Sequence, residues 1–246
     1  MKQIRIDINC DIGEGLGNES QLLPFISSCN IACGGHAGDQ LSMNEVVLLA
    51  KQYKIKVGAH PSYPDKENFG RESIGISEDE LIASVQEQVE NLLSIAKSKN
   101  VKMNHIKPHG ALYNDIAKDL LLAKIFLKAV IAYKESAYLY VPYGSVVEKE
   151  ALKQGFHIRR EAFLDRNYNA DLSLVSRKFA NAVLEDPKSV LARLLLMVHK
   201  KQVITENGTK IQINADTYCV HGDTASALQI LMYLSNQLSI HNIVIA

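Results

Sequence analysis

The chain of 246 residues has no tryptophan, few prolines and four cysteines. Lysine plus arginine equals aspartate plus glutamate at 27 each, so the formal net charge is zero. Without a basic excess, the composition gives no reason to expect a nucleic acid or an anionic membrane surface as partner. No apolar run reaches the roughly 18 residues of a membrane-spanning helix. The N-terminal MKQIRIDINCD lacks the apolar segment of a signal peptide, and cysteines in apolar surroundings are typical of reduced core thiols. We therefore expect a soluble, cytoplasmic protein.

Three common enzyme motifs are also missing. The sequence contains no GxxxxGK[ST] phosphate loop, no GxGxxG after a predicted strand and no GxSxG. These absences argue against P-loop ATP binding, a Rossmann dinucleotide site and a nucleophile-elbow hydrolase. The lack of tryptophan, a frequent sugar platform, disfavours a carbohydrate-active barrel. The chemistry that remains is water activation by carboxylates and histidines, with or without a metal ion.

Short apolar strands alternate with helical segments along the whole chain. Ser77 and Glu80 have capping-box spacing before one helix, and Pro187 suits the first position of another. Asn207-Gly208 predicts a hairpin, and residues 165–176 read as a long loop between a strand and a helix. Seven strand-then-helix units without a composition break predict one α/β domain over residues 1–246, with a mostly parallel sheet closed into a barrel. The strands are expected at 4–11, 27–35, 55–60, 104–110, 137–144, 156–163 and 216–223.

Four of the eight histidines directly follow predicted strands, and each has a glycine within two positions: His36, His60, His109 and His221. In a parallel barrel the carboxyl ends of all strands open on one face, where active sites lie. Glycine lets the backbone turn sharply and approach a ligand closely. We therefore expect these histidines to meet in one pocket with other polar residues. The further candidates are Asn9, Asp7, Asp11, Glu14, Asp39, Asp65, Arg71, Lys107, Glu161, Asp165, Arg166 and Asp223.

Side-chain alternation refines this expectation. Asp7, Asn9 and Asp11 share one face of the first strand, which we expect to be the barrel interior. Lys107 and His109 share a face in the same way. A lysine close to carboxylates can hold a substrate anion or stabilise a developing oxyanion. Aromatic residues that could wall the pocket are Tyr63, Phe69 and Tyr113, whereas His105, His157, His199 and His241 receive no role.

Several motifs together resemble the lactam-utilisation family, that of the A subunit of the ATP-hydrolysing 5-oxoprolinase. They follow the family's order over essentially the whole chain: DINCDIGEGLG (7–17), CNIACGGHAGD (29–39), VGAHPSYPD (57–65), NFGRE (68–72), IKPHGALYND (106–115), EAFLDRNY (161–168) and CVHGDT (219–224). The resemblance implies an irregular, seven-stranded TIM-like β/α barrel of the glycoside hydrolase and deacetylase kind. It also implies ATP-driven opening of 5-oxo-L-proline (pyroglutamate) to L-glutamate, in complex with two other subunits.

The resemblance leads to a hypothesis about roles. Partner subunits would supply or share the handling of ATP, while this barrel binds the lactam and activates water. The catalytic candidates are Asp11 or Asp7 as general base, His60 or His109 as proton shuttle, Lys107 as anion holder with Arg71 or Arg166, and Asp223 as the residue that orients His221. The substrate-binding candidates are Asn9, Glu14, His36, Arg71, Tyr113, Glu161, Arg166 and His221.

Two other functions remain open at this point. In deacetylases of this fold class an early-strand aspartate and two histidines bind a metal, and Asp11, His36 and His60 could hold a divalent zinc or manganese ion here. The chain would then be a stand-alone metal-dependent amidohydrolase or deacetylase, which metal analysis would reveal. The other alternative is a non-catalytic lactam-binding subunit, which would tolerate the loss of Asp11 and His109.

Overall fold

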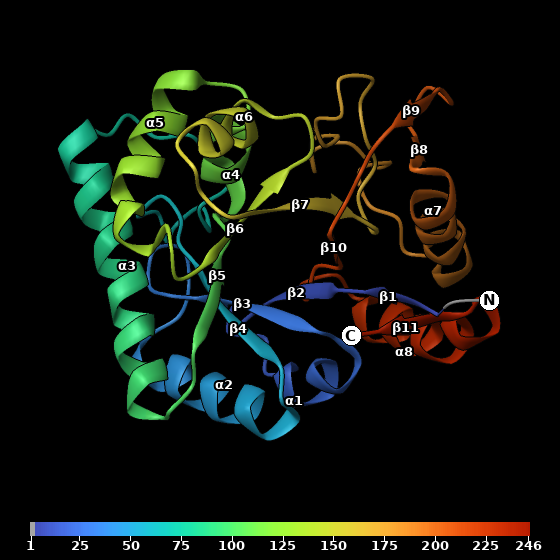
Figure 1. The fold of residues 1–246 in the computed structure, drawn as a ribbon, viewed down its shortest axis with the longest axis horizontal. Coiled ribbons are helices and arrows are strands. Elements are labelled where there is room, and N and C mark those ends of the chain that lie inside the picture. The colour runs from blue at the N-terminus through green and yellow to red at the C-terminus, as the bar shows by residue number, and fades with distance from the viewer. Residues whose placement is uncertain (1–2) are drawn as a thin grey trace.

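The computed structural model describes residues 3–246, within which seven parallel strands close a barrel (Figure 1). The strands are β2 (Ile8–Ile12), β3 (Ser28–Ala32), β4 (Lys56–His60), β5 (Met103–Ile106), β6 (Tyr138–Pro142), β7 (Ile158–Phe163) and β10 (Thr217–Cys219). β10 lies between β7 and β2, and the other neighbours follow chain order. The predicted closed, parallel α/β barrel is thus confirmed.

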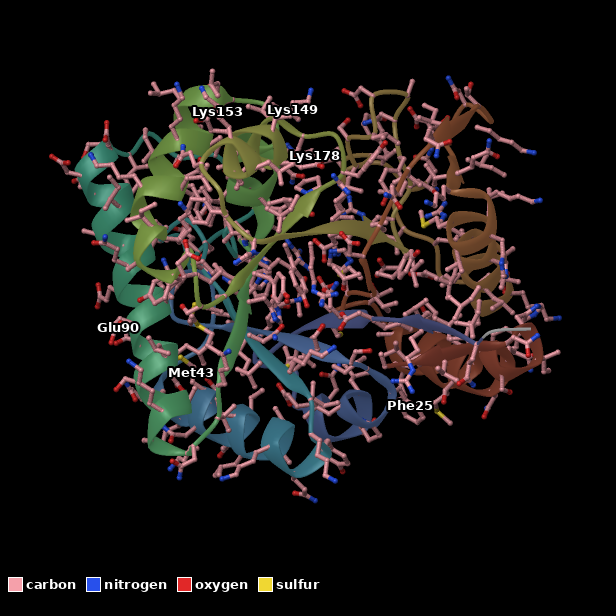
Figure 2. The ribbon with its side chains drawn as sticks, viewed as in Figure 1. Phe25, Met43, Glu90, Lys149, Lys153 and Lys178 are labelled. Atoms are coloured by element: carbon pink, nitrogen blue, oxygen red, sulfur yellow. The ribbon has the colours of Figure 1, made fainter. Side chains whose placement is uncertain are left out.

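Helices connect these strands and surround the barrel (Figure 1). They are α1 (Glu19–Leu22), α2 (Gln40–Tyr53), α3 (Glu78–Ser98), α4 (Gly110–Ile116), α5 (Leu120–Ala129), α6 (Val146–Lys153), α7 (Pro187–Lys200) and α8 (Ala227–Gln237), with 3₁₀ turns η1 (Leu23–Phe25), η2 (Ile131–Tyr133) and η3 (Leu238–His241). Each long helix is amphipathic: Met43 of α2 is buried in the core, whereas Glu90 of α3 and Lys149 of α6 lie at the outer surface (Figure 2). The helices therefore bury one face against the sheet and leave the other to solvent.

Local signals in the sequence fix several element ends. Ser77 and Glu80 form the predicted capping box at the start of α3, each side chain accepting a hydrogen bond from the other's backbone N–H. Pro187 opens α7 as predicted. Asn207-Gly208 lies in the turn of an antiparallel hairpin outside the barrel. Its strands are β8 (Gln202–Ile204) and β9 (Lys210–Gln212).

The predicted strand 4–11 is wrong in one respect, because it is two strands. β1 (Ile4–Ile6) pairs in parallel with β11 (Ile243–Ile245), away from the barrel, and only β2 belongs to the barrel. The backbone carbonyl of Ile6 accepts from Ala246, while that of Asp7 accepts from Tyr218 of β10. The hydrogen-bonding partner thus changes between two adjacent residues, which the alternation of side chains does not reveal.

The barrel interior is polar. Asn9 donates from Nδ2 to Thr217 Oγ1 at 2.8 Å, and its Oδ1 accepts from Asn30 Nδ2 at 2.8 Å. Ile8 and Cys10, on the other face of β2, are fully buried in the apolar core beneath the helices. The predicted inward face of the first strand is therefore confirmed, and its buried polar groups are satisfied by hydrogen bonds across the barrel.

All four cysteines are buried with free thiols, as predicted. Within residues 3–246, every helix is too short or too polar to cross a membrane.

Candidate functional site

A cavity of about 590 Å³ lies where the carboxyl ends of the barrel strands meet. Asp11 comes from β2, His60 from β4, Lys107 and His109 from the segment after β5, and His221 from the segment after β10. The structure thus brings together residues that are up to 210 positions apart in the sequence. Other predicted residues lining the cavity are Glu14, Arg71, Tyr113, Arg166 and Asp223.

Lys107 forms the floor of the cavity. Its Nζ lies 2.9 Å from Asp11 Oδ1 and 2.9 Å from Glu161 Oε1, and the side chain is only 2% exposed. Burial opposes the charge of Lys107, but Asp11, Cys219 and Glu161 outweigh burial and raise its pKa well above the ordinary value. Burial likewise opposes ionisation of Asp11, yet Lys107 holds the pKa of that carboxyl well below its usual range. The floor is therefore a buried ammonium between two carboxylates.

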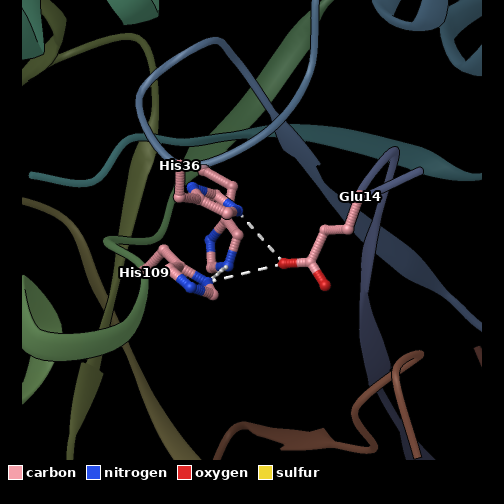
Figure 3. A group of neighbouring side chains, drawn as sticks. Glu14, His36 and His109 are labelled. Carbon is pink, nitrogen blue, oxygen red and sulfur yellow. Dashed lines mark hydrogen bonds and ion pairs between the residues drawn. The ribbon is translucent and has the colours of Figure 1, made fainter. Parts of the chain in front are cut away.

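Beside this floor lies a group of four side chains, Glu14, His36, His60 and His109, which we call the histidine cluster. Glu14 Oε1 lies 3.1 Å from His36 Nε2 and 3.5 Å from His109 Nδ1 (Figure 3). The rings of His36 and His109 stack at 3.6 Å between centroids, only 3° from parallel. Burial lowers the pKa of His36, and burial together with His36 and His60 lowers the pKa of His109 well below its usual value.

Backbone carbonyls fix the tautomers of two of these rings. His60 Nδ1 lies 2.7 Å from the carbonyl oxygen of Lys107, and His109 Nε2 lies 3.0 Å from that of Phe69. A carbonyl can only accept, so each of these nitrogens carries its hydrogen. The other two nitrogens, His60 Nε2 and His109 Nδ1, face each other at 3.0 Å.

On the opposite wall, His221 pairs with Asp165. His221 Nδ1 is 3.0 Å from Asp165 Oδ1, and the His221 backbone N–H donates to Asp165 Oδ2 at 2.8 Å. Burial opposes ionisation of Asp165, but His221 outweighs burial and lowers the pKa of that carboxyl. The prediction that Asp223 orients His221 is therefore wrong. Asp165 lies just beyond β7, the barrel neighbour of β10, so it emerges next to His221.

Asp223 instead connects three loops at the rim of the cavity. Its carboxylate forms ion pairs with Arg71 and with Arg177, the latter at 3.1 Å. Arg71 comes from the segment between β4 and α3, and Arg177 from the long loop between β7 and α7. Two arginines thus share one aspartate, which leaves a net positive charge at the rim.

Several predicted residues lie elsewhere or are differently engaged. Asp39 caps α2 by accepting from the Ser42 backbone N–H, Asp65 accepts from the Asn68 backbone N–H, and neither lines the cavity. Asp7 precedes β2 and lies at the amino end of the barrel, where it accepts from Ser28 Oγ at 2.7 Å and from Lys56 Nζ at 2.9 Å, and it does not line the cavity. Arg166 lines the cavity, but its guanidinium donates to the carbonyls of Val175 and Ala182. Arg166 therefore holds the long loop in place.

Sequence reasoning missed several residues of the site. Asn30 donates from Nδ2 to Asp11 Oδ1 at 2.8 Å. The alternation of side chains along the second predicted strand, 27–35, could have indicated that Asn30 faces the barrel interior. Asp165 stood among the polar candidates, but no sequence signal paired it with His221. Other cavity-lining residues without a predicted role include Lys118, Phe163, Arg177 and Lys178.

The metal ligands predicted from fold analogy fall into two groups of donor atoms, although Asp11 Oδ1 also lies 3.5 Å from His60 Nε2. Glu14 and His109 join His36 and His60 with one donor atom each, all within 4.8 Å, whereas Asp11 groups with Cys219 and His221. In that second group Lys107 Nζ lies 2.9 Å from Asp11 Oδ1 and 3.2 Å from Cys219 Sγ. The ammonium therefore already supplies a positive charge there, and the histidine cluster is the group suited to an added cation.

Comparisons with known proteins agree with this architecture. The model of the LamB/YcsF family matches residues 6–246. A Staphylococcus aureus (strain Newman) protein described as the A subunit of 5-oxoprolinase is 44% identical over 230 residues, which are 92% of each chain. The crystal structure of a lactam utilization protein from Thermus thermophilus superposes with a TM-score of 0.91 at 33% identity, covering 98% of this chain and 99% of that one. A deacetylase solved with its substrate has a TM-score of 0.50 at 11% identity over 100% of this chain and 88% of that one, a likeness of fold alone.

Proposed function

The chain belongs to the LamB/YcsF family, and on this premise we propose that it is the A subunit of an ATP-dependent 5-oxoprolinase. It would hydrolyse 5-oxo-L-proline to L-glutamate, coupled to hydrolysis of ATP to ADP and phosphate, together with two partner subunits in the cytoplasm. The observation that carries the proposal is the relative described as the 5-oxoprolinase A subunit, which matches over most of both chains. The chemistry of the cavity supports it in three further ways.

The first support is the match between the cavity and a small anionic lactam. 5-Oxo-L-proline carries one carboxylate, and the rim presents Arg71 and Arg177 around a single aspartate. Arg71 is the more available cation, with 41% of its side chain exposed, whereas Arg166 is occupied by backbone carbonyls. We therefore assign the substrate carboxylate to Arg71, with Arg177 beside it.

The second support is Lys107 at the floor. Once the lactam oxygen is phosphorylated it carries an anionic phosphoryl group, and a buried ammonium stabilises that negative charge without reorganising solvent. The flanking carboxylates keep Lys107 protonated, as the direction of its pKa shift shows. Lys107 is then the group that contacts the phosphorylated lactam oxygen.

The third support is the pair of His221 and Asp165. Asp165 binds Nδ1 of the ring, which leaves Nε2 as the acceptor for a proton from water. His221 lies within 4.8 Å of Asp11, ring nitrogen to carboxylate oxygen. Because the pKa of Asp11 is low, its carboxylate is a weak base, and we assign proton removal to His221 and the hydrogen-bonded positioning of water to Asp11.

ATP contributes by activating the substrate. A resonance-stabilised amide resists water, and phosphorylation of its oxygen by the partner subunits makes the ring carbon a better electrophile. Water then adds to that carbon, the ring C–N bond breaks as nitrogen takes a proton, and an acyl phosphate remains. A second water releases phosphate and leaves glutamate.

A coupled assay tests this function. The chain is incubated with 5-oxo-L-proline and ATP, with and without the partner subunits, and glutamate and phosphate are measured. We expect both products in equal amounts only with the partners, and loss of both in H221Q, with H157A as an exposed histidine control. Amide turnover by this chain alone without ATP would instead support a stand-alone hydrolase. Full activity of H221Q would remove His221 from the mechanism.

A further inference from the structure

We propose that the histidine cluster is a binding site for a first-row divalent transition metal ion such as Zn²⁺. His60 Nε2, His109 Nδ1 and Glu14 Oε1 are the ligands, and His36 positions two of them. The inference rests on the geometry of these four side chains and goes beyond the proposed function, which does not require it.

The first argument is that two bare nitrogens face each other. The carbonyls of Lys107 and Phe69 take the hydrogens of His60 Nδ1 and His109 Nε2. In the neutral rings, His60 Nε2 and His109 Nδ1 then carry lone pairs only, yet they lie 3.0 Å apart in a buried setting. Two lone pairs at that distance repel unless a cation lies between or beside them, and that cation is either a proton or a metal ion.

The second argument is the spacing of the donor atoms. Zn²⁺ binds imidazole nitrogen and carboxylate oxygen at about 2.0–2.1 Å in a tetrahedron, which sets neighbouring donor atoms about 3.3 Å apart. The separation is 3.0 Å between His60 Nε2 and His109 Nδ1 and 3.5 Å between His109 Nδ1 and Glu14 Oε1. All the donor atoms lie within 4.8 Å of one another, so small side-chain adjustments suffice to bind one ion.

The third argument concerns what supports the ligands. Metal-binding histidines commonly donate their second N–H to a carbonyl or carboxylate, and His60 and His109 both do. His36 cannot share the ion with His109, because their rings are parallel at 3.6 Å and their lone pairs do not converge. Its Nε2 lies 3.1 Å from Glu14 Oε1, so His36 holds both the carboxylate and the stacked ring in position.

The fourth argument is charge and access. Glu14 and Asp11 both carry formal negative charge, and Asp11 Oδ1 lies 3.5 Å from His60 Nε2. Glu14, His60 and His109 line the cavity, whereas His36 lies behind them. Two imidazoles and one carboxylate leave a coordination position open, as catalytic zinc sites do. Because these three side chains line the cavity, an ion bound to them would polarise a water molecule or a substrate oxygen there.

The test measures metal binding by the isolated chain, without substrate or partners. The protein is treated with a chelator, titrated with Co²⁺ by visible absorbance, and then with Zn²⁺ in competition. The variants are E14Q and H60Q for the ligands, H36Q for positioning, H221Q for the other group of donor atoms and H157A as an exposed histidine control. Circular dichroism confirms that each variant is folded.

We expect one Co²⁺ per chain with a tetrahedral or five-coordinate spectrum, displaced by Zn²⁺. Loss of an outer partner weakens metal binding by about 10–100-fold, so H36Q should fall in that range and folded E14Q should lose at least about 100-fold. H221Q and H157A should bind as the unaltered chain does. Binding that is absent, or equal in E14Q and the unaltered chain, would overturn the proposal and leave a shared proton between the two rings. Because no turnover is measured, this result is independent of the 5-oxoprolinase assay.

Discussion

Replacement of Lys107 by methionine should destabilise the fold strongly at neutral pH. Methionine fills a similar volume but removes the ammonium that lies 2.9 Å from both Asp11 and Glu161. Both carboxylates are at least 95% buried, so water cannot replace the lost partner. The variant must therefore bury two uncompensated charges, rearrange, or take up protons.

The size of this effect follows from the geometry. At 2.9 Å and an effective dielectric constant of about 20, each contact is worth about 6 kcal/mol of Coulomb energy, much of which desolvation offsets. Breaking a buried pair by removing one partner typically costs about 3–5 kcal/mol. For a chain of this size that corresponds to a fall in melting temperature of about 6–20 °C.

The dependence on pH has a definite sign. The folded pKa of Asp11 is lowered, so its contribution to stability is present above its unfolded pKa of about 3.9 and is lost as the pH falls through the folded value. At pH 7, K107M should therefore show the whole loss in its free energy of unfolding relative to the unaltered chain. Below about pH 4 this difference should shrink by about the amount that Asp11 contributes. Urea unfolding followed by circular dichroism at several pH values measures it.

Two controls make the test specific. K149M removes a lysine from the exposed face of α6 and should leave the urea midpoint unchanged. The double variant K107M/D11N removes one uncompensated carboxylate and should recover part of the lost stability. An unchanged urea midpoint for K107M at pH 7 would refute the claim that the Lys107 ammonium stabilises the floor of the cavity.

Other predictions concern single contacts. D165N should lower kcat by about 100- to 10,000-fold with little change in KM, because the amide no longer fixes the His221 tautomer, and steady-state kinetics of the reconstituted complex measures it. Similar kcat values in D165N and the unaltered chain would contradict this role. G58A should destabilise the fold by about 1–3 kcal/mol in thermal unfolding, because its new Cβ would lie 2.1 Å from His105 Nε2. The control G75A should be neutral in that measurement, because its Cβ meets no atom within 4 Å.

The sequence predicted the architecture well because periodicity and caps are local signals. The seven barrel strands, the capping box at Ser77 and the hairpin at Asn207-Gly208 each depend on residues close together in the chain. The division of the first strand at Asp7 and the pairing of β1 with β11 depend on a partner more than 200 residues away. Such pairings carry no local signal, and neither do short helices such as α4.

The sequence predicted which residues gather at the site better than it predicted which of them contact one another. Its members could be named because they follow strands, and strand ends converge in a parallel barrel. Which groups pair depends on the stagger of neighbouring strands and on loop paths. Asp223 is close to His221 in the sequence, yet Asp165 reaches it from the neighbouring strand. Asp7 shares the inward face with Asp11 but lies at the other end of the barrel, since alternation fixes the face and not the height.

The polar interior links stability of the barrel to the state of the site. Burial lowers the pKa of His105 to about 3, so this ring stays neutral and donates from Nε2 to Asn30 Oδ1 at 2.7 Å. That bond fixes the Asn30 amide, whose Nδ2 then donates to both Asn9 and Asp11. Asp11 in turn holds Lys107. Because each bond sets the direction of the next, a change in the barrel interior alters the charged floor of the cavity without touching a ligand. Substitutions such as G58A should therefore reduce activity along with stability. In a barrel with an apolar core, a loss of stability need not change the charges of the site.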